Sequence, residues 1–380
     1  MSCATEIYRS RQKALYTYLQ SEGLDGAVLA DFEGLRNRSV RYLCNLPQDA
    51  LLFCLAGGQS IMVPWDVPMA EELGQGGEII PYTEFDRSLP AAIRGLLERY
   101  SLARGRVELS GAFPYPLVVE SQGAFPGAQL LCRKGGLDAF LAGQRSVKDQ
   151  LELRQLRRAC EITNRLISGL RELLFERVRE VPELEVALYL DSQARSLGAE
   201  GMGFETLAAG SRRSYGIHAF PTFTAQPFAT PGLSIVDFGV RCDGYTSDVT
   251  LTVVRGPLSK AQERLLRTVE ETYRLALSQV KPGELPSQIS RRVDEAFAVQ
   301  GYRMPHSLGH GIGLDAHEEP YLRSNAGEQE KPLAPGMVVT IEPGLYGADT
   351  GGARLENDLL LTDEGAEVLT RAECIRLPEA

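Results

Sequence analysis

The chain has 380 residues and a mass of 41.6 kDa, which is enough for two or three domains with separate cores. Its composition is 43% apolar and 24% charged, typical of a globular protein, and a net charge of -10 without a coherent basic track argues against nucleic acid as a partner. The seven cysteines never form a Cys-x-x-Cys pair, so we expect reduced thiols. Because the sequence has neither a signal-peptide pattern nor a membrane-spanning apolar run, we expect a cytoplasmic protein that does not interact with membranes.

The first part of the chain alternates helical and strand-like patterns, which predicts a small mixed α/β domain over residues 1–140. The helical periodicity of 6–22 ends at Gly23, a suitable C-cap. Strands are expected at 25–31, 40–46, 50–56 and 59–65. Helices are expected near 67–74 and 88–102, and further strands at 79–82 and 106–110. The region contains no histidine and no tight carboxylate cluster, so we expect no chemistry in it.

A change of composition near Gly135 and Gly136 marks the predicted start of a second domain, which covers residues 145–380. This domain is expected to open with a long charged helix from about Val147. Three more helices are expected at 182–198, 259–281 and 287–300. Strand pairs lie between and after these helices. They carry every candidate functional residue.

All four histidines of the chain fall between His218 and His317, and three of them share the segment from His306 to His317. Histidine moves protons near neutral pH and is the commonest metal ligand, so this clustering predicts a single site. Glycines on both sides of His310 let the backbone approach other groups closely, and they argue against a helix at this point.

Two aspartates are predicted to lie together on a hairpin. In the segment 235–254, two apolar runs flank Asp243-Gly244, which is typical of a tight turn. With these two residues at the turn, Asp237 lies opposite Thr250, and Asp248 is its diagonal neighbour on the same face. Two carboxylates between apolar strand residues repel each other unless a cation lies between them.

The same pattern recurs near the C-terminus, where Glu342 ends one apolar strand and Glu356 is expected inside the next. Together with the two aspartates and one histidine, these glutamates form a mostly oxygen ligand set. Such a set suits a pair of ions such as manganese, cobalt, iron or zinc.

At these residues the chain resembles the pita-bread metallopeptidases, the family of methionine aminopeptidase, aminopeptidase P, prolidase and creatinase. The resemblance covers about 145–380 in order and spacing, and all five metal-ligand positions are filled: Asp237, Asp248, His310, Glu342 and Glu356. It implies that Asp248 and Glu356 bridge two ions, that Asp237 completes one site, and that His310 and Glu342 complete the other. It also implies an α/β fold in which a small creatinase-like N-terminal domain precedes a C-terminal pita-bread α+β domain.

Four further residues match family positions. By resemblance, His218 and His317 stabilise the developing oxyanion or orient the substrate. His306 lines the substrate pocket of the proline-specific members, and Arg354 supports the ligands through hydrogen bonds. A core histidine at 306 and a plain ion pair of Arg354 with a neighbouring carboxylate are the alternatives.

Two aromatic residues near His218, Tyr215 and Phe220, are expected in the core rather than in a pocket. Departures from the family at Ile217, Leu251 and Asn357 cluster around the pocket and leave the substrate preference open.

The N-terminal domain and the complete ligand set favour an enzyme of the Xaa-Pro dipeptidase or aminopeptidase P type. The resemblance implies two divalent ions, with manganese preferred over cobalt, zinc or iron, and a shared water that attacks the Xaa-Pro bond. Glu342 would carry the proton to the leaving nitrogen. The expected substrate is a proline-containing dipeptide or short peptide, and the expected assembly is a homodimer in which the N-terminal domain narrows the site.

Two other functions stay open. One is a creatinase-like amidohydrolase acting on a small non-peptide C–N bond, and the other is a noncatalytic pita-bread binding module.

Overall fold

The computed structural model describes residues 3–177, 181–325, 327 and 330–378. The chain divides into two compact units, Met1–Gln144 and Arg145–Ala380, and each is described separately.

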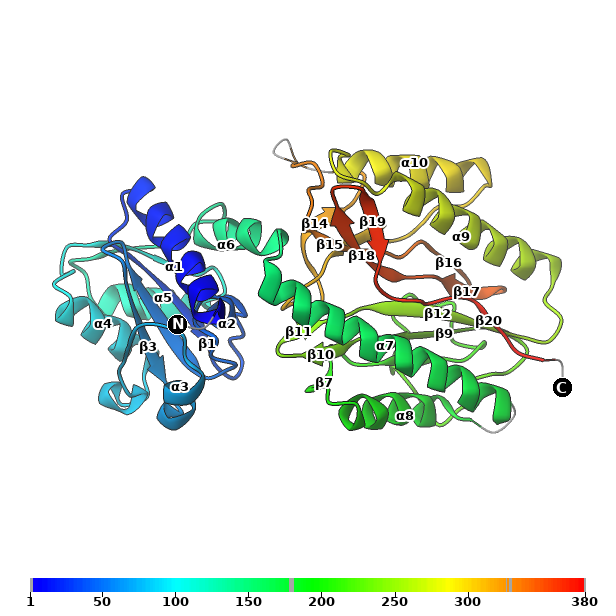
Figure 1. Ribbon diagram of the computed structural model, residues 1–380, viewed down its shortest axis with the longest axis horizontal. Helices are drawn as coiled ribbons and strands as arrows, with labels where there is room; N and C mark the ends of the chain where they lie inside the picture. The colour runs from blue at the N-terminus through cyan, green and yellow to red at the C-terminus, as the bar shows by residue number, and fades with distance from the viewer. Residues whose placement is uncertain (1–2, 178–180, 326, 328–329, 379–380) are drawn as a thin grey trace. The chain divides into compact units, whose positions relative to one another are not determined.

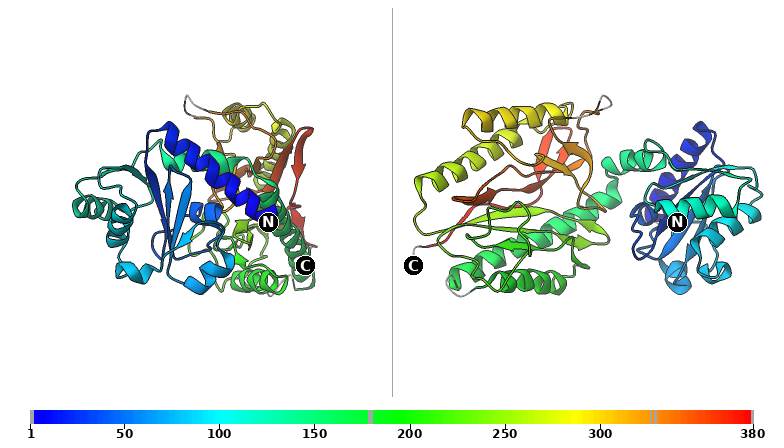
Figure 2. Two further views of the ribbon diagram at one scale, coloured as in Figure 1. Left: turned by 60° about the vertical axis from the view of Figure 1, so that its left-hand side comes forward. Right: turned by 180° about the vertical axis from the view of Figure 1, so that it is seen from behind.

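The first unit contains a six-stranded sheet in the order β4-β3-β2-β1-β5-β6 (Figure 1). Its strands are β1 (Gly26–Asp31), β2 (Ala50–Leu55), β3 (Gln59–Pro64), β4 (Glu78–Ile79), β5 (Arg106–Leu109) and β6 (Gln129–Leu131). Its helices are α1 (Cys3–Ser21), α2 (Ser39–Cys44), α3 (Val67–Leu73), η1 (Tyr82–Phe85), α4 (Leu89–Arg99) and α5 (Tyr115–Ala124). Every residue of β1 is buried, because helices cover both faces of the sheet; Figure 2 shows α1 and α4 on opposite faces.

One predicted strand of this unit, 40–46, is wrong, because the structure forms helix α2 there. The helix ends at Asn45 in the left-handed conformation, which asparagine tolerates well. Two of its last carbonyls, those of Tyr42 and Leu43, accept hydrogen bonds from the Arg11 and Gln12 side chains of α1. Strand β2 already pairs with β1 along its full length, so the sheet has no place for another strand at this point.

The second unit follows α6 (Leu137–Ser146), a helix that crosses the division between the units. Its own helices are α7 (Gln150–Glu176), α8 (Glu183–Ser196), α9 (Lys260–Gln279) and α10 (Pro286–Val299). Capping boxes at Asp149 and Ser259 define the starts of α7 and α9. The predicted helix start at Val147 is therefore slightly early, and Val147 instead forms a bridge with Met337.

Two sheets carry the functional residues of this unit. The first has the order β20-β12-β9-β8, and the second has the order β14-β13-β15-β18-β19. Their strands are β8 (Leu207–Ala209), β9 (Gly232–Phe238), β12 (Val249–Arg255), β20 (Ile375–Arg376), β13 (Gly309–Gly311), β14 (Glu318–Leu322), β15 (Val338–Ile341), β18 (Asn357–Thr362) and β19 (Gly365–Val368). A bridge between Thr250 and Glu356 connects the two sheets.

Shorter strands complete the unit: β7 (Gly201–Met202), β10 (Val240–Cys242), β11 (Tyr245–Thr246), β16 (Gly344–Gly347) and β17 (Gly351–Arg354). Helices α7 and α8 pack against β7, β8, β10 and β11, whereas α9 and α10 pack against β14, β16 and β17 (Figure 1). Apolar residues of all four helices and both sheets form one buried cluster. This core holds the strand ends on which the polar residues lie. Among the helices in the described residues, none has the length and apolar character needed to cross a membrane.

Candidate metal site

The predicted register of the aspartate hairpin is confirmed. Asp237 on β9 pairs with Thr250 on β12, and the turn residues Asp243 and Gly244 both have positive φ, 46° and 87°. Asp248 lies just before β12, and its backbone N–H donates a hydrogen bond of 3.1 Å to Asp358 Oδ2. The turn at Asp243-Gly244 and the two-residue alternation of side chains along the strands therefore bring both aspartates to the same cavity.

The two glutamates come from the second strand pair. Glu342 directly follows β15, as predicted. Glu356 was expected inside a strand, but it lies between β17 and β18, where its backbone bridges to Thr250 of the other sheet. The Thr250 hydroxyl donates a hydrogen bond of 2.7 Å to Glu356 Oε2. The bridge to Thr250 thus separates β17 from β18, and the Thr250 hydroxyl fixes the Glu356 carboxylate between these two strands.

His310 is the central residue of β13, which lies between β14 and β15. A Cβ atom at Gly309 would lie 2.1 Å from the Thr340 carbonyl oxygen, and one at Gly311 would lie 2.2 Å from the Glu319 carbonyl oxygen, so only glycine fits at both positions. The Nδ1 atom of His310 lies 3.1 Å from the Gly311 carbonyl and donates to it. Its Nε2 lone pair is therefore free to face a cation.

All nine site residues predicted from the sequence line one cavity of about 300 Å³. They are Asp237, Asp248, His310, Glu342, Glu356, His218, His306, His317 and Arg354. Tyr215 and Phe220 do not line it, and they are not core residues either, because they are 52% and 94% exposed. The expectation that these two aromatic residues are buried is wrong.

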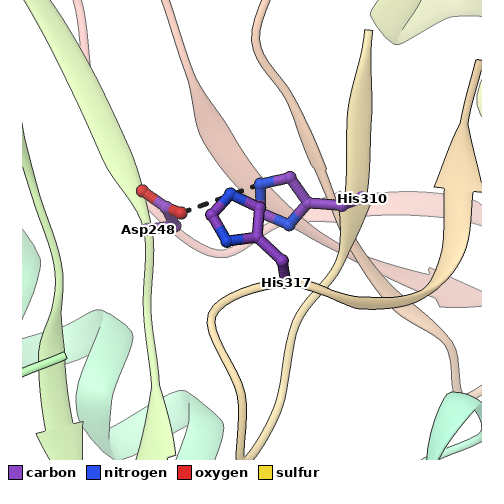
Figure 3. A group of neighbouring side chains, drawn as sticks. All are labelled: Asp248, His310 and His317. Atoms are coloured by element: carbon purple, nitrogen blue, oxygen red, sulfur yellow. Dashed lines mark ion pairs between the residues drawn. The ribbon is translucent and has the colours of Figure 1, made fainter. Parts of the chain in front are cut away.

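Three overlapping groups of side chains could each hold a metal ion, with ligand atoms within 4.8 Å of one another. The groups are Asp237, Asp248 and Glu356; His310, Glu342 and Glu356; and Asp248, His310 and His317. Figure 3 shows the last group, with both imidazole rings beside the Asp248 carboxylate. The His310 and His317 ring centroids are 4.1 Å apart. His317 was predicted to contact the substrate. Its ring lies directly beside the predicted metal ligands Asp248 and His310.

The carboxylates repel one another strongly. The pKa of Asp248 is raised well above its usual value, first by burial and then by the charge of Glu356. The pKa of Glu356 is also raised well above its usual value, first by burial and then by the charge of Glu342. Burial also raises the pKa of Glu342 to about 8, although the charge of Arg354 opposes this shift. One guanidinium does not balance the four ligand-type carboxylates and Glu205, which also lines this cavity.

The residues fit divalent cations, because two buried carboxylate oxygens, Asp237 Oδ1 and Glu356 Oε1, have no hydrogen-bond partner in the described part of the chain. A buried polar atom without a partner is costly unless a cation or a donor satisfies it. Burial lowers the pKa of His310 to about 3, with the charge of His317 as the next cause, so this imidazole is neutral, as a ligand must be. The site therefore combines unsatisfied oxygen acceptors with a neutral nitrogen ligand.

Residues 154–363, more than half of the chain, match the model of metallopeptidase family M24. The chain belongs to this family.

Two curated relatives of this M24 peptidase come from the genus Pyrococcus. A protein named Xaa-Pro dipeptidase from Pyrococcus horikoshii is 27% identical over 97% of this chain and 99% of its own length. A protein of the same name from Pyrococcus furiosus is 33% identical over 62% of this chain and 66% of its own length. Among solved structures, a dipeptidase from Pyrococcus horikoshii OT3 matches with a TM-score of 0.82 and 25% identity, over 97% of this chain and all of the other.

These comparisons confirm the predicted family, the α/β fold with an N-terminal domain followed by a pita-bread domain, and the prediction of an enzyme. The protein is a metallopeptidase, which also removes the noncatalytic binding module from the alternatives.

A chain of hydrogen bonds behind the carboxylates of this M24 peptidase was only partly predicted. Arg354 Nη2 lies 2.5 Å from Asp237 Oδ2, which is the ion pair with a neighbouring carboxylate given above as an alternative. Arg354 Nε donates to Thr250 Oγ1 at 2.9 Å. Arg354 Nη1 donates to the Tyr346 hydroxyl at 2.7 Å, and that hydroxyl lies 3.1 Å from His306 Nε2. His306 Nδ1 donates to the Ser307 carbonyl at 2.8 Å, so Nε2 accepts from Tyr346. Arg354 therefore connects Asp237 with His306 through a tyrosine that sequence reasoning missed.

Glu183, the first residue of α8, was also missed. It is fully buried, and its Oε2 atom accepts hydrogen bonds from the Thr224 backbone N–H at 2.8 Å, the Thr224 hydroxyl at 2.6 Å and the Arg213 guanidinium. Its Oε1 atom accepts one from the Gly210 backbone N–H at 2.7 Å. These contacts hold both ends of the segment that carries His218. No local pattern identifies them, because the partners lie 27 to 41 residues further along the chain.

Proposed function

We propose that the protein is a dinuclear metal-dependent Xaa-Pro dipeptidase, which hydrolyses the bond before proline in dipeptides or short peptides. The observation that carries the proposal is the convergence of five ligand-type side chains on one cavity, in which two buried carboxylate oxygens have no hydrogen-bond partner among the residues that the structure describes. The names of the two Pyrococcus relatives support the choice of substrate class.

In this proposal, Asp248 and Glu356 would hold both ions, with Asp237 at one position and His310 and Glu342 at the other. Asp248, Glu356 and His310 each belong to two candidate groups. Of these three, only the two carboxylates have two oxygens with which to face two ions, which supports their bridging role. Bound divalent ions would supply Lewis acidity, which lowers the pKa of water and polarises the scissile carbonyl.

The three remaining histidines contact the substrate in this proposal. His218 and His317 are exposed toward solvent and line the same cavity, so either can donate a hydrogen bond to the oxyanion that develops at the carbonyl. His306 is held by Tyr346 and Ser307 through both ring nitrogens. With both nitrogens engaged, His306 is suited to shaping the pocket for the proline ring rather than to exchanging protons.

Glu342 is the group that we assign to proton transfer. The nitrogen of a prolyl bond carries no hydrogen, so it must receive a proton before it leaves. Glu342 is 16% exposed at the cavity, with Oε1 3.5 Å from His310 Nε2 and Oε2 4.0 Å from His306 Nδ1. It is therefore open enough to reach a substrate and, as a carboxylate, to take up a proton and pass it to the leaving nitrogen.

We also propose manganese as the physiological metal, a homodimer as the assembly and the cytoplasm as the location. The mostly oxygen ligand set supports manganese over softer metals. The cysteines support a reducing compartment, because the six whose side chains are described are all free. In the homodimer, the N-terminal domain would pack against the partner subunit and narrow the site.

The decisive experiment compares Ala-Pro with Ala-Pro-Ala as substrates of protein reconstituted separately with manganese, cobalt, zinc and iron. We expect two ions per chain by elemental analysis, and higher kcat/KM on Ala-Pro with manganese. A preference for Ala-Pro-Ala would indicate an aminopeptidase instead. Hydrolysis of small non-peptide amides without any Xaa-Pro cleavage would refute the proposal in favour of a creatinase-like amidohydrolase, and full activity in a verified metal-free preparation would refute the mechanism.

A further inference from the structure

The residue after His317, Glu318, points away from the metal site. Glu318 is the first residue of β14, and it pairs with Gly311 of β13. His317, in the bend just before β14, lines the cavity, whereas Glu318 does not, so these adjacent side chains point to different sides of the backbone. Glu318 is only 9% exposed and contributes nothing to the cavity lining.

Two buried cations hold the Glu318 carboxylate. Lys148 Nζ lies 2.8 Å from Oε1, and Arg145 Nη2 contacts Oε2 and also lies 2.7 Å from Asp315 Oδ2. The side chain of Lys148 is fully buried and that of Arg145 is 9% exposed. Burial alone would raise the pKa of Glu318, but the charges of Lys148 and Arg145 outweigh it and lower the pKa below the usual value. Buried, charge-assisted contacts of this kind are strong and directional.

The segment that supplies these cations is itself fixed to the sheet. The Lys148 backbone N–H donates to the Gly336 carbonyl at 2.9 Å, and the neighbouring Val147 bridges to Met337. The cations therefore belong to the framework of the unit and not to a free surface loop.

The loop that carries His317 wraps around the same carboxylate. A Cβ atom at Gly313 would lie 2.3 Å from Glu318 Oε1, so the loop backbone closes directly over the carboxylate. The Gly313 carbonyl accepts a hydrogen bond of 2.8 Å from the Thr246 backbone N–H, and its own N–H donates to the Asp315 carbonyl at 3.1 Å. Removing the charge of Glu318 would weaken the ion pairs with Arg145 and Lys148 over which this loop closes.

We infer that Glu318 is a positioning residue, which holds the His317 imidazole against His310 by binding the 312–317 loop to Arg145 and Lys148. The catalytic importance of His317 rests on the proposed function, but the positioning itself does not. Arg145 and Lys148 lie outside the segment 154–363 that matches the family model, so the attachment is supplied by residues before that segment.

The test uses the full-length, zinc-loaded protein labelled at histidine, in which NMR reports four imidazoles separately. In Glu318→Gln we expect the His317 resonances to shift or broaden while those of His218 stay unchanged. We also expect kcat on Ala-Pro to fall about tenfold with a smaller change in KM, as for loss of a residue that orients an active-site histidine. The matched control is Glu367→Gln, which neutralises an exposed bidentate pair with Arg157 and should change neither measurement.

Lys148→Gln is the second variant, because its amide can still donate to Glu318 and it tests the same attachment from the other side. Unchanged His317 resonances in both folded variants would overturn the inference. Failure of both variants to fold would also overturn it, because the contacts would then be purely structural. If the wild-type protein cleaves no Xaa-Pro substrate, the proposed function fails, while the NMR comparison still decides the positioning of His317.

Discussion

Glu183 offers a quantitative test of how the segment that carries His218 is held. In Glu183→Gln the side chain keeps its shape, but one of the two acceptor oxygens becomes an NH₂ donor. The amide oxygen can take the place of Oε2 and keep the bonds to Thr224 and Arg213. The new NH₂ group then faces the Gly210 N–H at the position where Oε1 accepts a 2.7 Å bond. Two donors face each other there, and Arg213 loses its partner charge.

The expected cost follows from these losses. Removing one partner of a buried ion pair costs at least about 3 kcal/mol, which includes the unsatisfied donor left behind. In a unit of roughly 240 residues, 1 kcal/mol changes Tm by about 2–4 °C. We therefore expect Tm to fall by about 6–12 °C. At 25 °C the variant should stay folded, but kcat/KM on Ala-Pro should fall about tenfold, because the His218 segment is no longer fixed.

Calorimetry and steady-state kinetics on the metal-loaded protein measure both quantities. The control is Glu185→Gln on the same helix, which neutralises an exposed ion pair with Arg177 and should change Tm by less than about 2 °C. A Glu183→Gln protein with Tm within about 2 °C of wild type and unchanged kinetics would refute the reasoning. A large fall in Tm with full activity would show that the contacts stabilise the fold without positioning His218.

Three further predictions concern the charges of the site. Asp248→Asn should abolish activity and lower the metal content. The metal-free variant should nevertheless have a Tm no lower than that of metal-free wild type, because it loses a carboxylate that its neighbours repel. A clearly lower Tm would contradict this reasoning. Adding manganese to metal-free wild type at about 100 times its Kd should stabilise it by about 2.7 kcal/mol, or roughly 5–10 °C in Tm, and an unchanged melting curve would argue against a specific site. The pKa of Glu318 is lowered in the folded protein, so its contribution is present above the ordinary value of 4.5 and is lost as pH falls through the folded pKa. The Tm difference between wild type and Glu318→Gln should therefore be constant above about pH 5 and should shrink toward zero in more acidic buffers, whereas a pH-independent difference would assign it to packing.

The residues predicted for the site lie together because their signals are local. The turn at Asp243-Gly244 sets the register that places Asp237 opposite Thr250, and that register also identified Thr250 as a neighbour, although its bonds to Glu356 and Arg354 were not predicted. Glu318 could not be recognised in this way, because its partner Lys148 lies 170 residues away. An acidic residue that follows a site histidine gives no indication of which cation it binds.

The error at 40–46 has a similar cause. A short apolar run is compatible with a buried strand or with one face of a short helix, and periodicity alone does not separate them. Arg11 and Gln12, about thirty residues earlier, decide the outcome by binding the carbonyls at the end of α2. The interrupted strand at Glu356 likewise depends on a bridge to a distant sheet.

The position of Arg145 and Lys148 also constrains how halves of related proteins can be exchanged. A hybrid joined at Gln150, where α7 begins, would take these two side chains from the donor of the N-terminal half and Glu318 from the donor of the other half. A hybrid joined before Arg145 would keep all three from one parent. Functional hybrids should therefore favour crossovers on the N-terminal side of Arg145. The segment that must come from one parent thus begins before residue 154, where the match to the family begins.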